Sequence, residues 1–248
     1  MRQMGWSVCI LILTLVAFAA DRPDAVTLHT PPVHSMLPIG GQSVGITAWA
    51  ELSGRSDAPL HFTLTADLAE LQSNITPLVT AELNRSNRCG DRLEVQSATL
   101  APAAPAALLN LHVHYERWAC AKAMGREIVK RLVGGNAVLD VQLSPSVDSN
   151  APALHADVKN IDADGSLGEA LQSGSLGDTL REKIRGSVEK AFAKAATVPA
   201  LPPDVSSTAQ VRSLVFRDGG QGRLWLTVDG DVRVTAEQLR ALAGLREK

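Results

Sequence analysis

The sequence predicts an α+β fold in which one long amphipathic helix lies across a curved antiparallel sheet, with additional shorter helices. Between Ser175 and Ala196, apolar residues recur at every fourth position with charged residues between them, as a half-exposed helix requires. Elsewhere, apolar and polar residues alternate in short runs bounded by turn-forming residues, which is typical of antiparallel strands. A spacing of four drifts by about 40° per turn around a helix of 3.6 residues per turn, so the stripe curves and suits a curved sheet.

The N-terminal segment predicts export. Residues 1–20 have the form of a signal peptide, with Arg2 ahead of the apolar stretch 8–18 and small residues that place cleavage near Ala19 or Ala20. The Ala/Leu-rich composition favours a bacterial source, so we expect a periplasmic or secreted protein. No other stretch approaches about 18 consecutive apolar residues, and we expect no membrane span after signal removal.

Charge is nearly balanced along the chain. The 248 residues include 24 basic and 26 acidic ones. Nucleic-acid binders normally carry a basic surplus or stripe, so we expect no nucleic-acid partner. Removal of Arg2 with the signal leaves a net charge of −3, and this average predicts no affinity for anionic lipid head groups.

Two cysteines of the mature chain are predicted to form a disulfide. The runs on either side of the turn-like segment 101–105 alternate as the two arms of a hairpin. Pairing residues whose numbers add to 209 sets Leu100 opposite Leu109 and Cys89 opposite Cys120, at a separation that suits a disulfide. A bulge would shift this register by one. A redox-active pair is the alternative, but the C-x-x-C spacing is missing.

The remaining elements follow in order. Residues 21–42 are predicted to be an extended lead-in, and residues 43–248 a single domain. Its expected elements are strands at 43–50 and 60–66, a helix from Asp67 interrupted by Pro77, the disulfide hairpin, a hairpin at 137–143 and 154–158, the long helix, a hairpin at 211–216 and 224–234, and a short helix opened by Thr235. Residues 122–133 are ambiguous, because Met124, Ile128 and Leu132 also fit a helix that Gly134 would end.

No motif predicts catalysis or a bound cofactor. His112, His114 and Glu116 lie two residues apart and share one face of a strand, where they could hold zinc, but no further ligand is evident. A polar solvent-facing surface is the alternative that we adopt, and we predict no metal. Ser175 fits a helix N-cap better than a nucleophile, so we predict a protein that is not an enzyme.

Trp118 and Trp225 are candidates for exposed aromatic side chains. Alternation places Trp225 on the polar face of its strand. Two interpretations remain open: partial cover by the C-terminal helix, or an edge that contacts a lipid or a partner protein.

The order of elements resembles the tubular lipid-binding (TULIP-like) superfamily. The resemblance covers residues 43–234 and is carried by the helix 176–192, the proline-rich exit 198–202 and the strand 222–226. The chain departs from the family in having one module and in carrying its cysteines on a hairpin.

That resemblance implies a highly curved antiparallel sheet around the helix, with a lumen that binds lipid or another amphiphile without catalysis, and by extension lipid transport. The residues that would line this apolar groove are Leu176, Leu180, Ile184, Val188, Phe192, Leu224, Leu226 and Val228. The alternative is that these side chains fill an ordinary core, and that the protein is a protein-binding or assembly module of the envelope.

Overall fold

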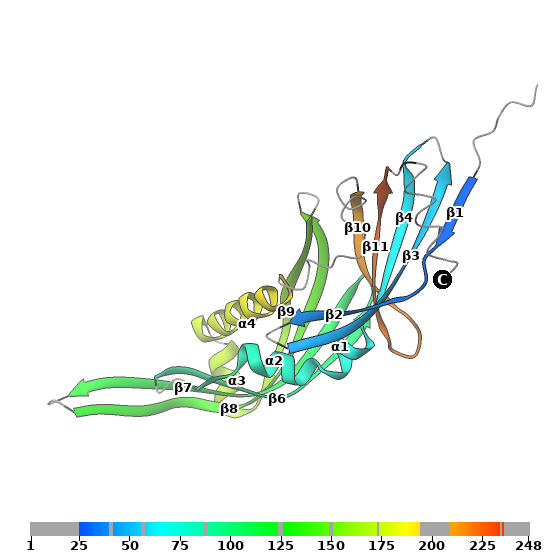
Figure 1. Cartoon of the computed structure of the whole chain (residues 1–248). Coiled ribbons are helices and arrows are strands. Elements are labelled where there is room, and N and C mark those ends of the chain that lie inside the picture. Colours follow the sequence, from blue (N-terminus) through cyan, green and yellow to red (C-terminus); the bar gives the residue numbers. More distant parts are fainter. Residues whose placement is uncertain are drawn as a thin grey trace, which may run out of the picture.

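The computed structural model contains two antiparallel sheets with four short helices (Figure 1). It describes residues 25–39, 42–55, 58–86, 89–123, 126–148, 151–172, 174–193, 209–233 and 235. Strands hold 67% of these residues and helices 22%. The fold is therefore mostly β.

Sheet A has the strand order β1-β3-β4-β11-β10, and β2 also pairs with β3. Its strands are β1 (Ala25–His29), β2 (Val33–Ile39), β3 (Gln42–Arg55), β4 (Leu60–Asp67), β10 (Ala209–Asp218) and β11 (Leu224–Val232). The stretch predicted as a lead-in thus supplies β1 and β2, which pair with successive parts of β3. Pro31 and Pro32 separate these two edge strands, and Pro38 lies within β2, where a missing N–H is tolerated.

Sheet B has the order β5-β6-β7-β8-β9, with every neighbouring pair antiparallel. Its strands are β5 (Arg85–Ser86), β6 (Gly90–Ala103), β7 (Ala106–Ala123), β8 (Arg126–Asp148) and β9 (Ala151–Ala163). The predicted pairing of Leu100 with Leu109 is confirmed. A bulge at Gln96 then shifts the register by one, so that Leu93 faces Tyr115.

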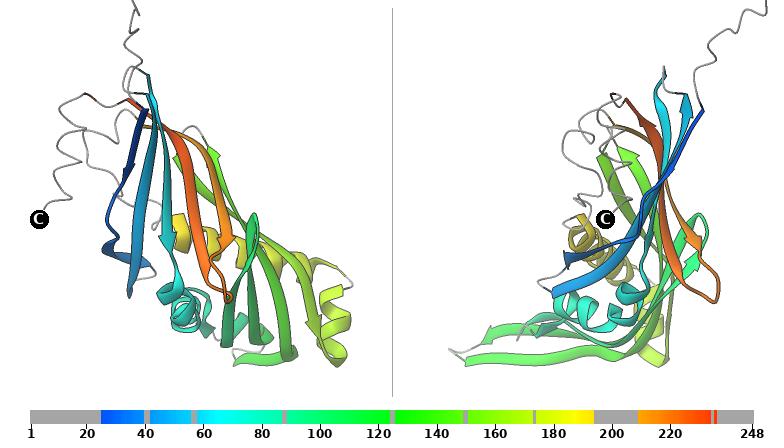
Figure 2. Two further views of the ribbon diagram at one scale, coloured as in Figure 1. Left: turned by 90° about the vertical axis from the view of Figure 1, so that its right-hand side faces the viewer. Right: turned by 45° about the vertical axis from the view of Figure 1, so that its right-hand side comes forward.

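The helices are α1 (Ala69–Ser73), α2 (Ile75–Leu83), α3 (Gly165–Gln172) and α4 (Ser175–Ala193). Helices α2, α3 and α4 lie against sheet B, and α1 packs against β3 of sheet A as well as β6 of sheet B (Figure 2). The interrupted first helix is confirmed, although the break falls at Asn74. Pro77 lies in the first turn of α2, where a proline is tolerated. None of the helices among the described residues has the length and apolar character needed to cross a bilayer.

The predicted fold class is wrong. No long helix is enclosed by one sheet in the described part of the chain; instead, two separate sheets carry four short helices. Helix α4 has 19 residues and packs against β9, α3 and α2. The apolar stripe of α4 does face the interior, but a stripe shows only that one face of a helix is buried, and it leaves open whether the cover is one curved sheet or several elements.

The helix considered for residues 122–133 is also wrong, because residues 122–123 end β7 and residues 126–133 belong to β8, while Met124 lies outside the described residues. Ile128 and Leu132 are four residues apart, and four is both close to one helical turn and an even number. Residues at an even spacing share a face of a strand as well. The pattern therefore could not separate the two structures, and the pairing of Ala121 with Ile128 across the hairpin decides for strand.

Gln72 on α1 joins the two sheets. Its Nε2 donates to the carbonyl oxygens of Leu100 on β6 and Gly222 in the β10–β11 turn, both at 2.9 Å. Its Oε1 accepts from the backbone N–H of Leu224 at 2.8 Å. A further bond joins the sheets where Phe216 N–H donates to Pro105 O at 2.9 Å. One side chain thus bonds to three backbone groups, one on sheet B and two at the β10–β11 end of sheet A.

Replacing Gln72 with Ala should lower the free energy of unfolding by about 1–3 kcal/mol, because the N–H of the buried Leu224 and two carbonyl groups lose their partner. Urea denaturation followed by circular dichroism measures this change in the free energy of unfolding. Gln42→Ala is the matched control, since Gln42 makes a single exposed bond of 3.4 Å, and it should change stability by about 0.5 kcal/mol or less. Equal effects of the two substitutions would show that Gln72 does not join the sheets.

Candidate functional site

The end of the β7–β8 hairpin extends beyond the rest of the protein (Figures 1 and 2). We call its described residues, 118–123 and 126–132, the arm. Strands β7 and β8 have 18 and 23 residues, and the half of each strand nearer the turn between β6 and β7 is buried in the core. The arm therefore continues two core strands and is not a separate loop.

A disulfide holds the base of the arm. Cys89, just before β6, is bonded to Cys120 on β7, with their Cα atoms 5.7 Å apart. The predicted pairing is confirmed, and it survives the bulge in β6 that shifts the register. The bond ties the shorter strand β6 to the arm, and it is compatible with an oxidising compartment.

A buried carboxylate anchors the inner face of the hairpin where the arm begins. Asp91 on β6 has a side chain only 10% exposed, and it accepts hydrogen bonds from Tyr115 Oη at 2.7 Å and Arg117 at 2.6 Å. Lys183 on α4 also pairs with it. Burial raises the pKa of Asp91, but the hydrogen bonds from Lys183, Tyr115 and Arg117 outweigh burial and hold that pKa below its usual range. The ion pair between Lys183 and Asp91 thereby links helix α4 to the base of the arm.

A second carboxylate lies on the opposite face. Glu116 on β7 accepts from Trp118 Nε1 at 2.8 Å and from Arg131 at 3.1 Å. Arg92 approaches it at 3.9 Å and also lies over the Trp118 ring, 4.4 Å from its centroid. The bonds from Trp118 and Arg131 lower the pKa of Glu116. Trp118, predicted as exposed, is therefore partly covered and hydrogen-bonded.

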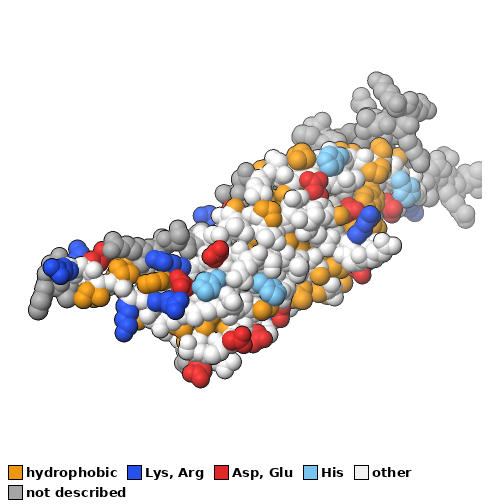
Figure 3. All heavy atoms as spheres, turned by 90° about the horizontal axis from the view of Figure 1, so that it is seen from below, with side chains coloured by type: hydrophobic (Ala, Val, Ile, Leu, Met, Phe, Trp, Pro, Cys, Tyr) orange, Lys and Arg blue, Asp and Glu red, His pale blue; other side chains and the backbone are white. Residues whose placement is uncertain are grey.

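The arm itself is basic and partly apolar. It carries four cations, Lys122, Arg126, Lys130 and Arg131, and one carboxylate, Glu127. Figure 3 shows basic and apolar side chains interspersed over this end of the molecule. Ile128 and Leu132 are 54% and 60% exposed, and they are two of the four large hydrophobic residues that are exposed in the described part of the chain, the others being Val33 and Met36 on β2. Leu132 projects at a register shift, where Trp118 pairs with Arg131 and Arg117 pairs with Val133.

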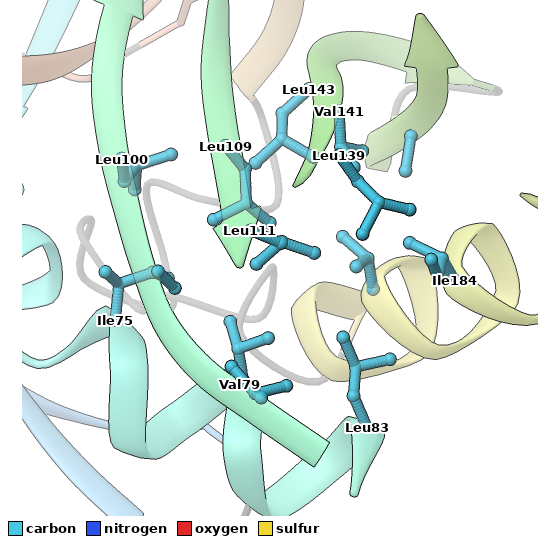
Figure 4. Close-up of a cluster of buried hydrophobic side chains, with 14 of the residues drawn as sticks. Ile75, Val79, Leu83, Leu100, Leu109, Leu111, Leu139, Val141, Leu143 and Ile184 are labelled. Carbon is cyan, nitrogen blue, oxygen red and sulfur yellow. The ribbon is translucent and has the colours of Figure 1, made fainter. Parts of the chain in front are cut away.

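The residues predicted to line a lumen lie in packed clusters. Leu180, Ile184, Val188 and Leu224 are buried in the main core, and Figure 4 shows Ile184 beside Leu139 and Val141 of β8. The others are placed differently: Leu176 and Leu226 pack against the main core, Val228 packs against a second cluster around Phe62, and the side chain of Phe192 lies outside the described residues.

A shallow apolar groove borders this core between β2, α2 and α4. Its walls are Ile39, Ile75, Leu78, Val79, Leu83 and Val188, with Glu82 and Ser187. Its volume is about 20 Å³, whereas pockets for small molecules have about 300–1,000 Å³. In this conformation the groove has room for little more than one water molecule.

The other candidate residues form no metal centre among the described residues. His112 and His114 share a face of β7 as predicted, but His114 lies 2.9 Å from Asn136 Oδ1 and 3.7 Å from Glu116. The potential ligand group found in this part of the chain is Cys89, Cys120 and Glu127, whose two sulfurs are consumed by the disulfide. Trp225 packs edge-on against Trp49, with centroids 5.3 Å apart, and the C-terminal helix expected beside it lies outside the described residues.

Comparison with known proteins gives no relationship: no family model matches the chain, and no curated protein or solved structure is significantly similar to it. The similarity to the tubular lipid-binding superfamily therefore stays a prediction.

Replacing Asp91 with Asn should destabilise the protein by about 1–3 kcal/mol at neutral pH, because three charge-assisted or buried hydrogen bonds weaken. The pKa of Asp91 is lowered by folding from its model-peptide value of 3.8. Its contribution to stability is thus present above that value and is lost as pH falls through the folded pKa. The difference between wild type and variant should shrink below about pH 4.

Urea denaturation at several pH values measures this difference. The control is Asp162→Asn, an exposed carboxylate on β9, which should change stability by about 0.5 kcal/mol or less. A difference for Asp91→Asn that is the same at pH 3 and pH 7 would contradict the assignment.

Proposed function

We propose that this chain is a non-catalytic docking protein that binds an acidic partner surface through its arm. The observation that carries the proposal is the concentration of Lys122, Arg126, Lys130 and Arg131 beside the exposed Ile128 and Leu132 on a hairpin that extends from the body. Exposed apolar side chains on a protruding element favour an interaction surface over a solvated face.

Charge asymmetry supports an acidic partner. With four of its basic residues and one acidic residue on the arm, the chain has 20 basic and 25 acidic residues elsewhere. Lys122, Arg126 and Lys130 form no salt bridge to any residue that the structure describes, although Glu127 stands opposite Lys122 across the hairpin. A local positive field on an otherwise acidic molecule orients the arm toward negative surfaces during encounter.

Rigidity also supports the proposal. The disulfide, the Asp91 cluster and the Glu116 cluster fix the base of the arm from its edge and from both faces. A contact surface ordered before binding loses less conformational entropy when it binds.

The amphiphile-binding groove predicted from the sequence remains a separate prediction. Its residues pack against one another, and the adjoining groove is small. The absence of catalysis and the exported location likewise stay predictions. For the function that we propose here, a filled core serves as the support of the arm.

The arm can be tested by neutralising its charges. The triple variant Lys122→Gln, Arg126→Gln, Lys130→Gln should reduce retention of the full-length protein with the cell-envelope fraction of its source organism by about tenfold or more, since each substitution removes an attraction to the acidic partner. Quantitative immunoblotting of membrane and soluble fractions measures retention.

The matched control neutralises three cations elsewhere: Lys159→Gln, Arg181→Gln, Arg223→Gln. It changes the net charge by the same amount, and the three residues are on β9, on α4 and before β11. Retention of this control should equal that of wild type. If both triple variants are retained like wild type, the arm is not the docking surface.

A further inference from the structure

We infer that the acidic surface recognised by the arm is an anionic phospholipid bilayer, on which the arm lies with Ile128 and Leu132 entering the interface between head groups and acyl chains. This inference rests on the proposed docking function and names the partner.

One face of the arm combines cationic and aliphatic side chains. Alternation along β8 places Arg126, Ile128 and Lys130 on one face. The residues opposite Ile128 and Lys130 on β7 are Ala121 and Ala119, which are too small to cover them. An aliphatic side chain therefore stands between two long cationic ones. Such a face matches the boundary of a bilayer, where apolar groups are buried while Lys and Arg extend to the phosphates.

The arm differs in composition from the centre of a typical protein–protein interface. The centre of a protein–protein interface is depleted of charged residues, and Lys in particular is rare there. On the arm, cations flank Ile128 on its own face, and Arg131 precedes Leu132 in the chain. The aliphatic side chain of Ile128 therefore has cations as its neighbours on the same face of β8. A lipid surface accommodates this arrangement, because fluid head groups rearrange around the cations.

The arm protrudes far enough from the rest of the protein to contact a flat surface (Figure 1). The arm continues beyond the helices and sheet A, so it can lie on a flat surface without a clash from the rest of the protein (Figures 1 and 3). The acidic residues are more numerous on the rest of the chain. The body is therefore repelled from an anionic surface while the arm is attracted, and this orients the protein with the arm toward the membrane.

Flotation with lipid vesicles tests the inference. The full-length mature protein should bind vesicles of equimolar phosphatidylglycerol and phosphatidylcholine, and bind vesicles of phosphatidylcholine alone much more weakly. Each basic residue near an anionic surface strengthens binding by about fivefold. Arg126 and Lys130 share the face of Ile128, whereas Lys122 lies on the other face opposite Glu127, so the Lys122, Arg126 and Lys130 triple variant should bind the anionic vesicles at least about 25-fold more weakly. The control triple variant at Lys159, Arg181 and Arg223 should bind like wild type.

A second variant separates the apolar contact from the charge. Ile128→Ser with Leu132→Ser should keep the salt-dependent attraction but lose the part of binding that persists at high salt, where charge is screened. Both side chains are more than half exposed, so the fold should survive, and an intact disulfide with an unchanged urea midpoint confirms it.

Three results would overturn the inference. Equal binding of the wild type to anionic and neutral vesicles would exclude recognition of anionic lipid. Equal weakening of vesicle binding in both triple variants would exclude the arm as the contact surface. If wild type fails to bind vesicles while the arm triple variant still loses retention in the envelope fraction, the partner is a protein and the docking function stands. If neither assay depends on the arm, both proposals fail.

Discussion

The pairing of β7 with β8 is the constraint on which the rest of the structure depends. Near the core, this pairing sets Leu109 against Val141 and Leu111 against Leu139, all fully buried. The same two strands then leave the core and form the arm. Because a shift of one residue would turn every buried side chain of a strand to the other face, the core fixes the register of the arm as well. The position of each arm cation thus follows from packing far from it.

The base of the arm and its outer part differ in how their charges are paired. Asp91 and Glu116 lie on opposite faces, and they engage Arg117 and Arg131. These two arginines therefore stabilise the base of the arm. Among the described residues, the cations farther out, Lys122, Arg126 and Lys130, form no salt bridge, although Glu127 stands opposite Lys122 across the hairpin. Positive charge is therefore closely paired at the base of the arm and only partly balanced farther out.

The sequence predicted local elements better than their arrangement. The disulfide, the hairpin register near Leu100, the two-piece first helix and the apolar face of α4 follow from spacing alone. The two-sheet arrangement did not, because alternation identifies strands but does not say which strands pair across a long distance in the chain. Gln72 is an example: nothing in its surroundings signals a residue that bonds to segments 28 and 150 positions away.

The candidate site was missed for a related reason. The cations of the arm are visible in the sequence, but the overall charge of −2 averages them with acidic residues on other elements. The apolar residues Ile128 and Leu132 are visible too, but their segment is ambiguous in the sequence, since a spacing of four fits both a helix and a strand. Only the cross-strand pairing shows that cations and aliphatic side chains share one exposed ribbon.

The net charge of the whole chain predicts no affinity for anionic lipid head groups, yet screening limits each electrostatic interaction to about 10 Å at moderate salt. At that range, a membrane in contact with the arm responds to Lys122, Arg126, Lys130 and the single arm carboxylate Glu127, and not to the net charge of the whole chain. An acidic remainder then strengthens orientation, because it disfavours every approach except the one that leads with the arm. Near-neutral composition and a basic contact surface are therefore compatible in one protein, provided that the fold separates the charges by more than the screening distance.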